Sequence, residues 1–391
     1  MVRFVPVEEG TNTSARIVVV GVGGCGCNAI EHMIDARIKG VHFVAINTDI
    51  QSLRRSRAPV KVQIGQQLTK GLGAGANPVK GRQAAIENRE DIIKALRGAD
   101  MVFITAGLGG GTGTGGAPVV AEVARELKAL TVAIVTTPML VEGKVRSRQA
   151  EEGLRELKKR VDTYITISNE KLIKEIGREV PILEAFRRAD DVLRHGVQSI
   201  SDLITMSGLI NLDFADVKTI MKDAGRAFMG LGTGVGEERA VEAADSALSC
   251  PLVEDSDIHG AKGIIINISG GKDLTLYEAT QAASIIQKYA DGNANIIFGA
   301  VVDGERERGE LCVTVIATGF DDSARRRRRA AERGMESELP LFARADELER
   351  PTFLRRSASA AAEGCPVEHA APKEEYDEEF LDIPTFLRKN S

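Results

Sequence analysis

Three glycine-rich segments have residue types and spacing that suit the binding of phosphate groups. Residues 21–26 read Gly-Val-Gly-Gly-Cys-Gly, which fits the pattern G-x-G-x-x-G. Residues 109–115 read Gly-Gly-Gly-Thr-Gly-Thr-Gly, and residues 71–76 form a third glycine-rich stretch. Glycines let backbone N–H groups approach an anion closely, and a helix that begins at such a loop adds the positive end of its dipole. The three segments therefore predict a site for a phosphorylated ligand.

The first segment alone leaves two classes of enzyme open. It is typical of dinucleotide-binding proteins, which carry an acidic residue about 20 residues further on. Asp49 follows the second apolar run, 28 residues after Gly21, so an NAD-dependent oxidoreductase is one alternative. The segment at 109–115 argues against it, because a nicotinamide enzyme needs one such loop, and three loops around one crevice make room for a triphosphate. The pattern G-x-x-x-x-G-K-[ST] does not occur, which excludes a Walker-type nucleotidase.

A pair of carboxylates lies in a different part of the chain. Residues 211–216 read Asn-Leu-Asp-Phe-Ala-Asp. Asp213 and Asp216 could polarise a water molecule or help to hold Mg²⁺. They cannot bind phosphate directly, because like charges repel. Capping of a helix by Asp213 is the structural alternative.

Composition excludes several other functions. The chain has 391 residues with a net charge of −5, and only 4% of them are aromatic, so neither a basic field nor stacking platforms for nucleic acid are present. The five cysteines lack zinc-ribbon spacing, and we expect no metal site. The first residues lack the apolar core of a signal peptide, and no apolar run approaches the ~18 residues of a membrane span. We therefore expect a cytoplasmic protein without direct membrane insertion.

Alternation of β-branched runs with helical stretches predicts the fold. Residues 15–180 are expected to form a doubly wound α/β domain with a parallel sheet, after a flexible N-terminus of residues 1–14. Residues 181–208 predict a long central helix with apolar residues on several faces, packed between two domains. Residues 209–319 predict a smaller C-terminal α/β domain. The expected strands are 17–20, 41–46, 101–105, 131–136, 163–167, 263–268, 295–302 and 310–318, and the expected helices are 28–38, 79–97, 118–127, 145–160, 214–223, 237–248 and 275–290.

The last part of the chain has a different composition. Residues 320–375 lose the apolar periodicity and include five consecutive arginines, which predicts a disordered linker. The sequence Pro-Thr-Phe-Leu-Arg occurs twice, at 351–355 and at 384–388. Apolar residues in a polar tail have no core to join. The terminal segment, residues 376–391, is therefore predicted to be a partner-binding peptide.

Five motifs taken in order resemble the FtsZ family, the tubulin-like GTPases of bacterial cell division. They are GVGGCGCNA at 21–29, NTD at 47–49, GLGAGANP at 71–78, GGGTGTG at 109–115 and NLDFADV at 211–217. The resemblance covers about residues 12–320 and resumes at residues 382–389. It implies a tubulin/FtsZ-like fold and a GTPase that polymerises head to tail and forms the division ring at mid-cell. The chain departs from the family at positions 25 and 27, where cysteine replaces glycine or alanine and brings two thiols to the nucleotide.

The resemblance also implies roles for individual residues. The phosphates of GTP or GDP, with Mg²⁺ accompanying GTP, would lie against two of the glycine loops, and the third would sense the γ-phosphate. Asp213, Asp216 and Asn211 would act on the nucleotide of the neighbouring subunit, so that hydrolysis requires assembly. A nucleotide-binding scaffold without hydrolysis is the rival that these carboxylates argue against. Membrane-tethering division proteins would bind residues 380–389, Phe380 to Lys389. The nucleotide-binding residues implied are Gly24, Cys25, Gly26, Cys27 and Asn28; Ala74, Gly75 and Ala76; Gly111, Thr112 and Gly113; Glu142 and Arg146 for the ribose; and Asn169, Phe186 and Asp190 for the guanine.

Overall fold

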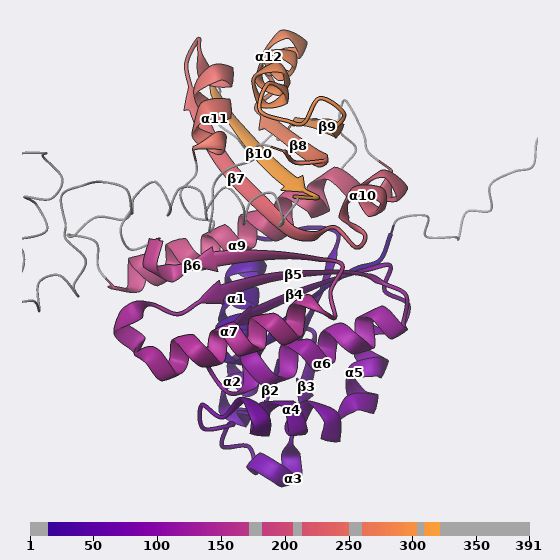
Figure 1. The fold of residues 1–391 in the computed structure, drawn as a ribbon, viewed down its shortest axis with the longest axis vertical. Helices are drawn as coiled ribbons and strands as arrows, with labels where there is room; N and C mark the ends of the chain where they lie inside the picture. Colours follow the sequence, from indigo (N-terminus) through magenta and orange to yellow (C-terminus); the bar gives the residue numbers. More distant parts are fainter. Residues whose placement is uncertain (1–14, 172–181, 206–212, 250–259, 303–308, 321–391) are drawn as a thin grey trace, which may run out of the picture. The chain divides into compact units, whose positions relative to one another are not determined.

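The computed structural model describes residues 15–171, 182–205, 213–249, 260–302 and 309–320 (Figure 1). The chain divides into one unit of residues 1–321 and a second of residues 322–391. The predicted N-terminal segment 1–14, the terminal peptide 376–391 and all but the first residue of the predicted linker lie outside the described residues.

A ten-stranded sheet organises the first unit. Its order is β3-β2-β1-β4-β5-β6-β7-β10-β8-β9, and the six strands from β3 to β6 run parallel to one another. The chain order reverses between β1 and β4, and open α/β sheets bind ligands at such a point, outside the carboxyl ends of the strands. The doubly wound arrangement expected from the sequence is confirmed. These strands are β1 (Ile17–Val22), β2 (Val41–Asn47), β3 (Val60–Gln63), β4 (Met101–Gly107), β5 (Leu130–Thr137) and β6 (Thr163–Ser168).

Both faces of the parallel strands are buried, which explains their uninterrupted apolar runs. Ile17 and Val19 of β1 belong to one core cluster, whereas Val18 and Val20 belong to another. The first cluster includes residues of α1 and α9, and the second includes residues of α4 to α7. The helices of this part are α1 (Gly23–Asp35), α2 (Ile50–Arg55), α3 (Gln66–Thr69), α4 (Pro78–Glu87), α5 (Arg89–Leu96), α6 (Thr112–Glu126), the 3₁₀ turn η1 (Leu140–Glu142) and α7 (Lys144–Lys158).

Three predicted helices differ from the structure by more than a few terminal residues. The helix predicted at 118–127 begins at Thr112, and the one predicted at 28–38 begins at Gly23, so both glycine segments form first helical turns. Glycine has a low helix propensity, but close packing leaves no room for a side chain at some of these positions. A Cβ atom at Gly115 would lie 2.0 Å from the carbonyl oxygen of Pro78. The helix predicted at 79–97 is two helices, which meet at Asn88.

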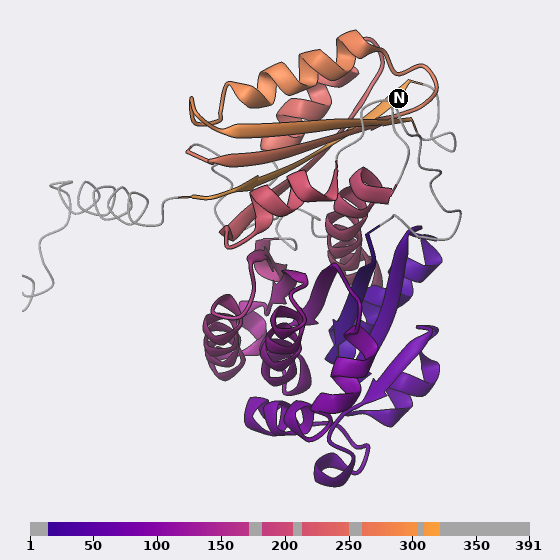
Figure 2. The same cartoon turned by 90° about the vertical axis from the view of Figure 1, so that its right-hand side faces the viewer.

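The helix α9 (Ile182–Thr205) lies between the parallel strands and the C-terminal part, as predicted (Figures 1 and 2). Ser201 donates a hydrogen bond to the carbonyl of Lys39 after α1, at 3.3 Å. On the other side, Asn267 donates to the carbonyl of Ser199, at 3.2 Å. A Cβ atom at Gly196 would lie 3.1 Å from Ile134 Cδ1 of β5 and 3.0 Å from Met229 Sδ of β7. The helix therefore contacts both parts closely.

A long strand of the C-terminal part escaped the sequence prediction. β7 (Gly225–Val235) carries glycine at alternate positions, which hides its strand pattern. A Cβ atom at Gly230 would lie 2.0 Å from the carbonyl oxygen of Ala247, and one at Gly232 would lie 2.1 Å from that of Ala243. These glycines let a helix pack directly on the strand. The other elements of this part are α10 (Phe214–Met221), α11 (Arg239–Leu248), β8 (Gly263–Gly270), α12 (Leu276–Gln287), β9 (Asn295–Val302) and β10 (Glu310–Thr318).

A buried arginine joins α11 to α12 and to the loop before α12. Arg239 has a side chain only 5% exposed and contacts Glu278 at 2.6 Å and Asp273 at 2.7 Å. The hydrogen bonds from Arg239 lower the pKa of Glu278 from 4.5 to about 2. Because the folded pKa lies below the ordinary value, this carboxylate stabilises the fold above pH 4.5, and that contribution is lost as the pH falls towards 2.

We expect Arg239→Met to destabilise the first unit strongly. Removing one partner leaves carboxylates without compensation at a part-buried site, which costs about 3 kcal/mol. Thermal unfolding followed by circular dichroism should show a lower midpoint by roughly 6 °C or more. The double variant Arg239→Met with Glu278→Gln is the control and should recover part of the loss. An unchanged midpoint at pH 7 in Arg239→Met would contradict this account.

Candidate functional site

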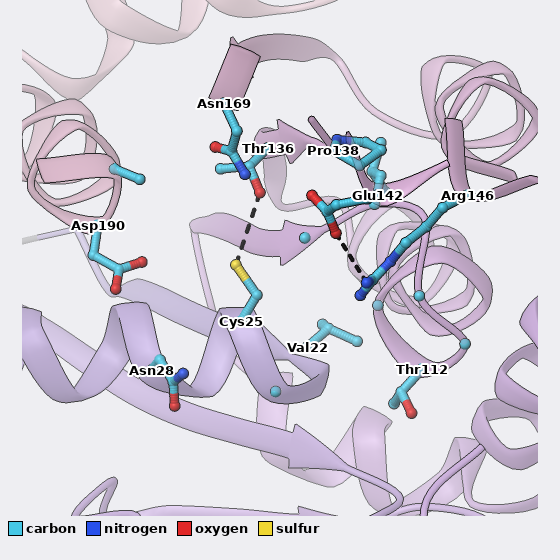
Figure 3. Close-up of a pocket in the computed structure, with 17 residues that line it drawn as sticks. Val22, Cys25, Asn28, Thr112, Thr136, Pro138, Glu142, Arg146, Asn169 and Asp190 are labelled. Carbon is cyan, nitrogen blue, oxygen red and sulfur yellow. Dashed lines mark hydrogen bonds and ion pairs between the residues drawn. The ribbon is translucent and has the colours of Figure 1, made fainter. Parts of the chain in front are cut away.

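A cavity of about 470 Å³ lies at the carboxyl ends of the parallel strands, on both sides of the switch between β1 and β4 (Figure 3). In Figure 3 Asp190 lies to the left of the cavity, Glu142 and Arg146 lie to the right, and Cys25 lies between them. The lining residues are Val22, Gly24, Cys25, Asn28, Gly107, Leu108, Gly110, Gly111, Thr112, Gly113, Thr136, Pro138, Glu142, Arg146, Asn169, Ala189 and Asp190.

Two glycine loops meet at the floor of the cavity. A Cβ atom at Gly23 would lie 2.9 Å from the backbone nitrogen of Gly113, and one at Gly113 would lie 2.6 Å from the carbonyl oxygen of Gly107. α1 begins at the first loop and α6 at the second, and neither N-cap residue, Val22 or Gly111, caps its helix with a side chain. The first N–H groups of both helices are thus not bonded by an N-cap side chain, and the positive ends of both dipoles point to the same cavity. This arrangement suits a ligand with several phosphates.

The third glycine loop supports the second from outside the cavity. A Cβ atom at Gly111 would lie 2.8 Å from Ala74 Cβ and 2.9 Å from the nitrogen of Asn77. Gly75 and Ala76 have positive φ values of 60° and 56°, the second unusual for a residue with a Cβ atom. Of the three residues predicted to sense a γ-phosphate, Ala74 lies against the phosphate loop, and none of the three lines the cavity.

Threonine hydroxyls brace the second loop. Thr112 and Thr48 are both buried, and their hydroxyl oxygens are 2.7 Å apart. Thr114 accepts a hydrogen bond from the backbone N–H of Gly109, at 2.8 Å. Asp49, the acid that a dinucleotide-binding enzyme would require, accepts from the N–H of Gln51 and caps α2. The geometry therefore favours a rigid phosphate loop and gives Asp49 a structural role.

The two cysteines near the first loop occupy different positions. Cys25 is exposed at the cavity wall, with its Sγ atom 3.7 Å from the hydroxyl of Thr136. Desolvation of the sulfur by the surrounding protein raises its pKa to about 11. Cys27 is buried beneath the loop, and desolvation raises its pKa to about 12. Gly26 also lies beneath, because a Cβ atom there would be 2.3 Å from the carbonyl of Thr105. Both thiols stay protonated at neutral pH, and only that of Cys25 lines the cavity.

Polar side chains form the rim on both sides. Glu142 and Arg146 make an ion pair at 2.9 Å, four residues apart, so they are at once a surface pair and part of the lining. The side-chain carbonyl oxygen of Asn169 is buried and has no hydrogen-bond partner among the described residues. Buried acceptors are normally satisfied, so this atom calls for a donor such as an N–H group of a ligand.

Asp190 is a part-buried acceptor at the same end of the cavity. Burial raises its pKa to about 6, against the opposing effect of His32, whose Nδ1 atom lies 3.1 Å from Asp190 Oδ2. A carboxylate here can accept from two adjacent N–H donors of a base. The side chain of Phe186, predicted to stack on that base, lies outside the described residues.

The carboxylates of the predicted catalytic segment lie at the other end of the strands. Asp213 directly precedes α10 and Asp216 lies on its first turn; both are exposed, and neither lines the cavity. Thr163, the first residue of β6, donates a hydrogen bond to the carbonyl of Met221 at the end of α10. α10 therefore packs at the amino ends of the strands whose carboxyl ends form the cavity. Asp213 occupies the N-cap position of α10, but its side chain makes no capping hydrogen bond. Asn211 lies outside the described residues.

Several cavity residues were not singled out from the sequence. Leu108 and Pro138 directly follow β4 and β5, Thr136 lies near the end of β5, and Ala189 faces the cavity from α9. A position at the carboxyl end of an apolar strand is the signal that could have identified the first three. The described part of the chain holds no group of three or more His, Cys, Asp or Glu side chains placed to bind a metal ion. Within the same residues, no helix is both long and apolar enough to cross a membrane.

Comparison with known proteins gives the family. The GTPase domain of the Tubulin/FtsZ family matches residues 16–177, and the C-terminal domain of the FtsZ family matches residues 225–321. A solved structure of an empty FtsZ dimer from M. jannaschii is 49% identical, with 79% of this chain and 89% of that chain covered and a TM-score of 0.75. A GDP-bound CetZ1 monomer from Haloferax volcanii is 18% identical, with 80% of this chain and 97% of that chain covered and a TM-score of 0.69, which shows a shared fold.

The site and the comparisons agree with one another and rule out the oxidoreductase. The two phosphate loops belong to a GTPase domain rather than to a nicotinamide-binding one. The chain is a member of the tubulin/FtsZ family, a GTPase of the polymerising cytoskeletal class that binds GTP and GDP.

Proposed function

We propose that this GTPase assembles head to tail into the filaments of the cell-division ring at the septum and hydrolyses GTP at each contact between subunits. The observation that carries the proposal is the position of two functional elements at opposite ends of the same strands. The cavity lies at the carboxyl ends, and Asp213 and Asp216 lie on the helix packed at the amino ends. A contact that repeats head to tail without closing produces a filament.

Within the cavity we propose an orientation for GTP that follows the polarity of the lining. The phosphates bind backbone N–H groups of the uncapped helix starts, at residues 24–28 and 111–113, although Gly26 and the Cys27 side chain pack beneath the first loop. The γ-phosphate is sensed through the adjoining loop, residues 74–76, which contacts Gly111. The ribose meets Glu142 and Arg146, while Asn169, Phe186 and Asp190 bind the guanine. The unsatisfied oxygen of Asn169 supports this orientation, because guanine offers N–H donors.

We propose that GTP hydrolysis requires residues from both ends of the molecule, the cavity of one subunit and α10 of the next. The helix starts and glycine loops offer N–H donors but no group that would orient an attacking water. Asp213 and Asp216 of the next subunit supply that group by accepting a proton from the water, and Asn211 would assist by hydrogen bonding. Mg²⁺ would accompany GTP and neutralise charge on its phosphates. Such ions use few protein ligands and keep several waters.

The dependence of activity on protein concentration tests this proposal. We expect GTP hydrolysis per molecule to be low in dilute solution and to rise above a threshold concentration, because each site is completed by a neighbour. Phosphate release with GTP and with ATP across a dilution series measures it, and light scattering reports assembly in the same samples. A constant activity per molecule across the series would contradict a site shared between subunits.

We also propose domain boundaries and a location. The GTP-binding domain spans 15–180, the central helix 181–208 and the activating domain 209–319, followed by the linker 320–375 and the peptide 376–391. Membrane-tethering division proteins bind Phe380 to Lys389 and hold the filament at mid-cell on the cytoplasmic side. The support is compositional, because five apolar side chains occur in this acidic tail.

Deletion of residues 380–391 should leave assembly and GTP hydrolysis unchanged and remove binding to the tether. A pull-down with the division tethers compares the full chain, the deletion, and the deletion combined with Phe353→Ala. The last variant tests whether the inner copy at 351–355 substitutes for the terminal one. Full binding by both shortened chains would refute the peptide assignment.

A further inference from the structure

One ion pair links the two ends of the proposed nucleotide site. His32 lies on the last turn of α1, the helix that begins at the first phosphate loop, and its Nδ1 atom lies 3.1 Å from Asp190 Oδ2 on α9. The Asp190 side chain is 13% exposed and lines the cavity, whereas the His32 ring is 36% exposed. The ring therefore contacts the carboxylate from the side of α1.

Discrimination between guanine and adenine depends on whether the Asp190 carboxylate is ionised. Guanine presents two adjacent donors, N1–H and the 2-amino group, which an ionised carboxylate accepts together. Adenine presents an unprotonated N1 at the same place, so an ionised carboxylate repels it. A protonated carboxyl group loses this distinction because its O–H group can donate to adenine. Discrimination therefore requires Asp190 to be ionised and held in one orientation.

The surroundings of Asp190 oppose ionisation, apart from His32. Burial favours the neutral acid, and the neighbouring carboxylate of Asp191 on the same helix acts in the same direction. The charge of Asp191 is partly offset by Arg194, whose Nε atom lies 3.1 Å from Asp191 Oδ1. The thiol of Cys25 also faces Asp190 from α1 but stays protonated. His32 supplies both a hydrogen bond and, when protonated, a positive charge that favour the carboxylate.

We propose that His32 is a positioning residue that holds Asp190 as an oriented, ionised acceptor and thereby sets the preference for guanine over adenine. This inference rests on the proposed function, in which Asp190 reads the base. A hydrogen bond from an outer residue commonly fixes the rotamer of a ligand-binding side chain. Because α1 carries the phosphate loop at one end and His32 at the other, one rigid helix would align both halves of the nucleotide.

The test is nucleotide affinity of the full-length protein, measured below the assembly threshold with GTP, ITP, XTP and ATP between pH 5.5 and 8.5. Wild type should lose its preference for GTP over ATP as the pH falls through about 6. His32→Ala should lower GTP affinity about 10-fold at pH 7 with little effect on ATP, because a charge-assisted hydrogen bond contributes about 1.4 kcal/mol. Its preference for GTP should also disappear at a higher pH than in wild type.

Two further variants separate a positioning role from a structural one. Asn can place its side-chain N–H near the position of His Nδ1, so His32→Asn should recover most of the GTP affinity at pH 8, but as a neutral residue it should not restore the profile below pH 7. His42→Ala is the matched control, because His42 is an exposed histidine on β2, and it should behave as wild type. An unchanged GTP-to-ATP ratio in folded His32→Ala, or equal losses for both nucleotides, would overturn the inference.

Asp190→Asn distinguishes failure of this inference from failure of the proposed function. The amide can donate to the 2-oxo group of xanthine, so this variant should lose affinity for GTP and gain affinity for XTP. If Asp190→Asn leaves the preference unchanged, Asp190 does not read the base and the proposed orientation of the nucleotide fails. If Asp190→Asn switches the preference but His32→Ala changes nothing, only the role of His32 is refuted.

Discussion

Asp213→Ala will reduce the steady-state rate of GTP hydrolysis about 100-fold or more, the usual contribution of a group that activates a water. GTP affinity of the monomer will not change measurably. The reason is geometric, because Asp213 lies on a helix at the amino ends of the strands and does not line the cavity of its own subunit. Phosphate release measures the first quantity, and nucleotide binding below the assembly threshold measures the second. Asp245→Ala, which removes an exposed carboxylate on α11, is the matched control and should retain wild-type activity.

A mixing experiment shows in which subunit Asp213 acts. Asp213→Ala has an intact cavity, whereas a variant that cannot bind GTP keeps an intact α10. If the carboxylate acts on the neighbour, a mixture of the two inactive proteins will recover hydrolysis at contacts that combine the intact cavity with the intact α10. The shared site is refuted if the mixture does not hydrolyse GTP and monomeric Asp213→Ala has also lost GTP binding. Asp213 would then act at the cavity of its own subunit.

Gly113→Ala is the variant suited to that experiment, since we expect it to weaken GTP binding about 100-fold. An alanine Cβ at this position would lie 2.6 Å from the carbonyl oxygen of Gly107, so the start of α6 must move away from β4. The displacement would misplace about two N–H donors to phosphate, a loss of about 3 kcal/mol or a factor of about 100. Calorimetric titration with GDP measures the affinity, and circular dichroism confirms the fold.

Gly110→Ala provides the comparison for Gly113→Ala within the same loop. Both residues line the cavity, but no atom lies within 4 Å of a Cβ at Gly110. The added methyl group therefore does not move the loop, and GDP affinity should fall far less than in Gly113→Ala. Equal affinities of the two variants would show that packing against Gly107 does not position the phosphate loop.

Much of the site could be predicted from the residues alone. The glycine segments, their threonines and the separate carboxylates are short chemical patterns, and phosphate binding needs those residue types at that spacing. The loops after β1 and β4 line one cavity for this reason. Gly26 and Cys27 were predicted with the others, but they lie beneath the loop. Spacing along the chain does not reveal which side of a helical turn faces the ligand.

Boundaries and pairings needed the tertiary structure. The starts of α1 and α6 and the whole of β7 were missed because glycine is a weak former of helices and strands. At several of these positions, such as Gly26, Gly115 and Gly230, a Cβ atom would lie about 2 Å from a backbone oxygen of another segment. Helix and strand propensities are properties of the local sequence and contain no information about such a neighbour.

The sequence by itself determined the class of fold, the phosphate chemistry and the family. These follow from local patterns, since buried parallel strands need apolar runs and phosphate loops need glycine. Only the tertiary structure decided that Asp213 lies at the far end of the strands from the cavity, and that His32 meets Asp190. The physical reason is that both relations join residues far apart in the chain, and they arise from the order of the strands and the packing of α1 against α9, which no local pattern records.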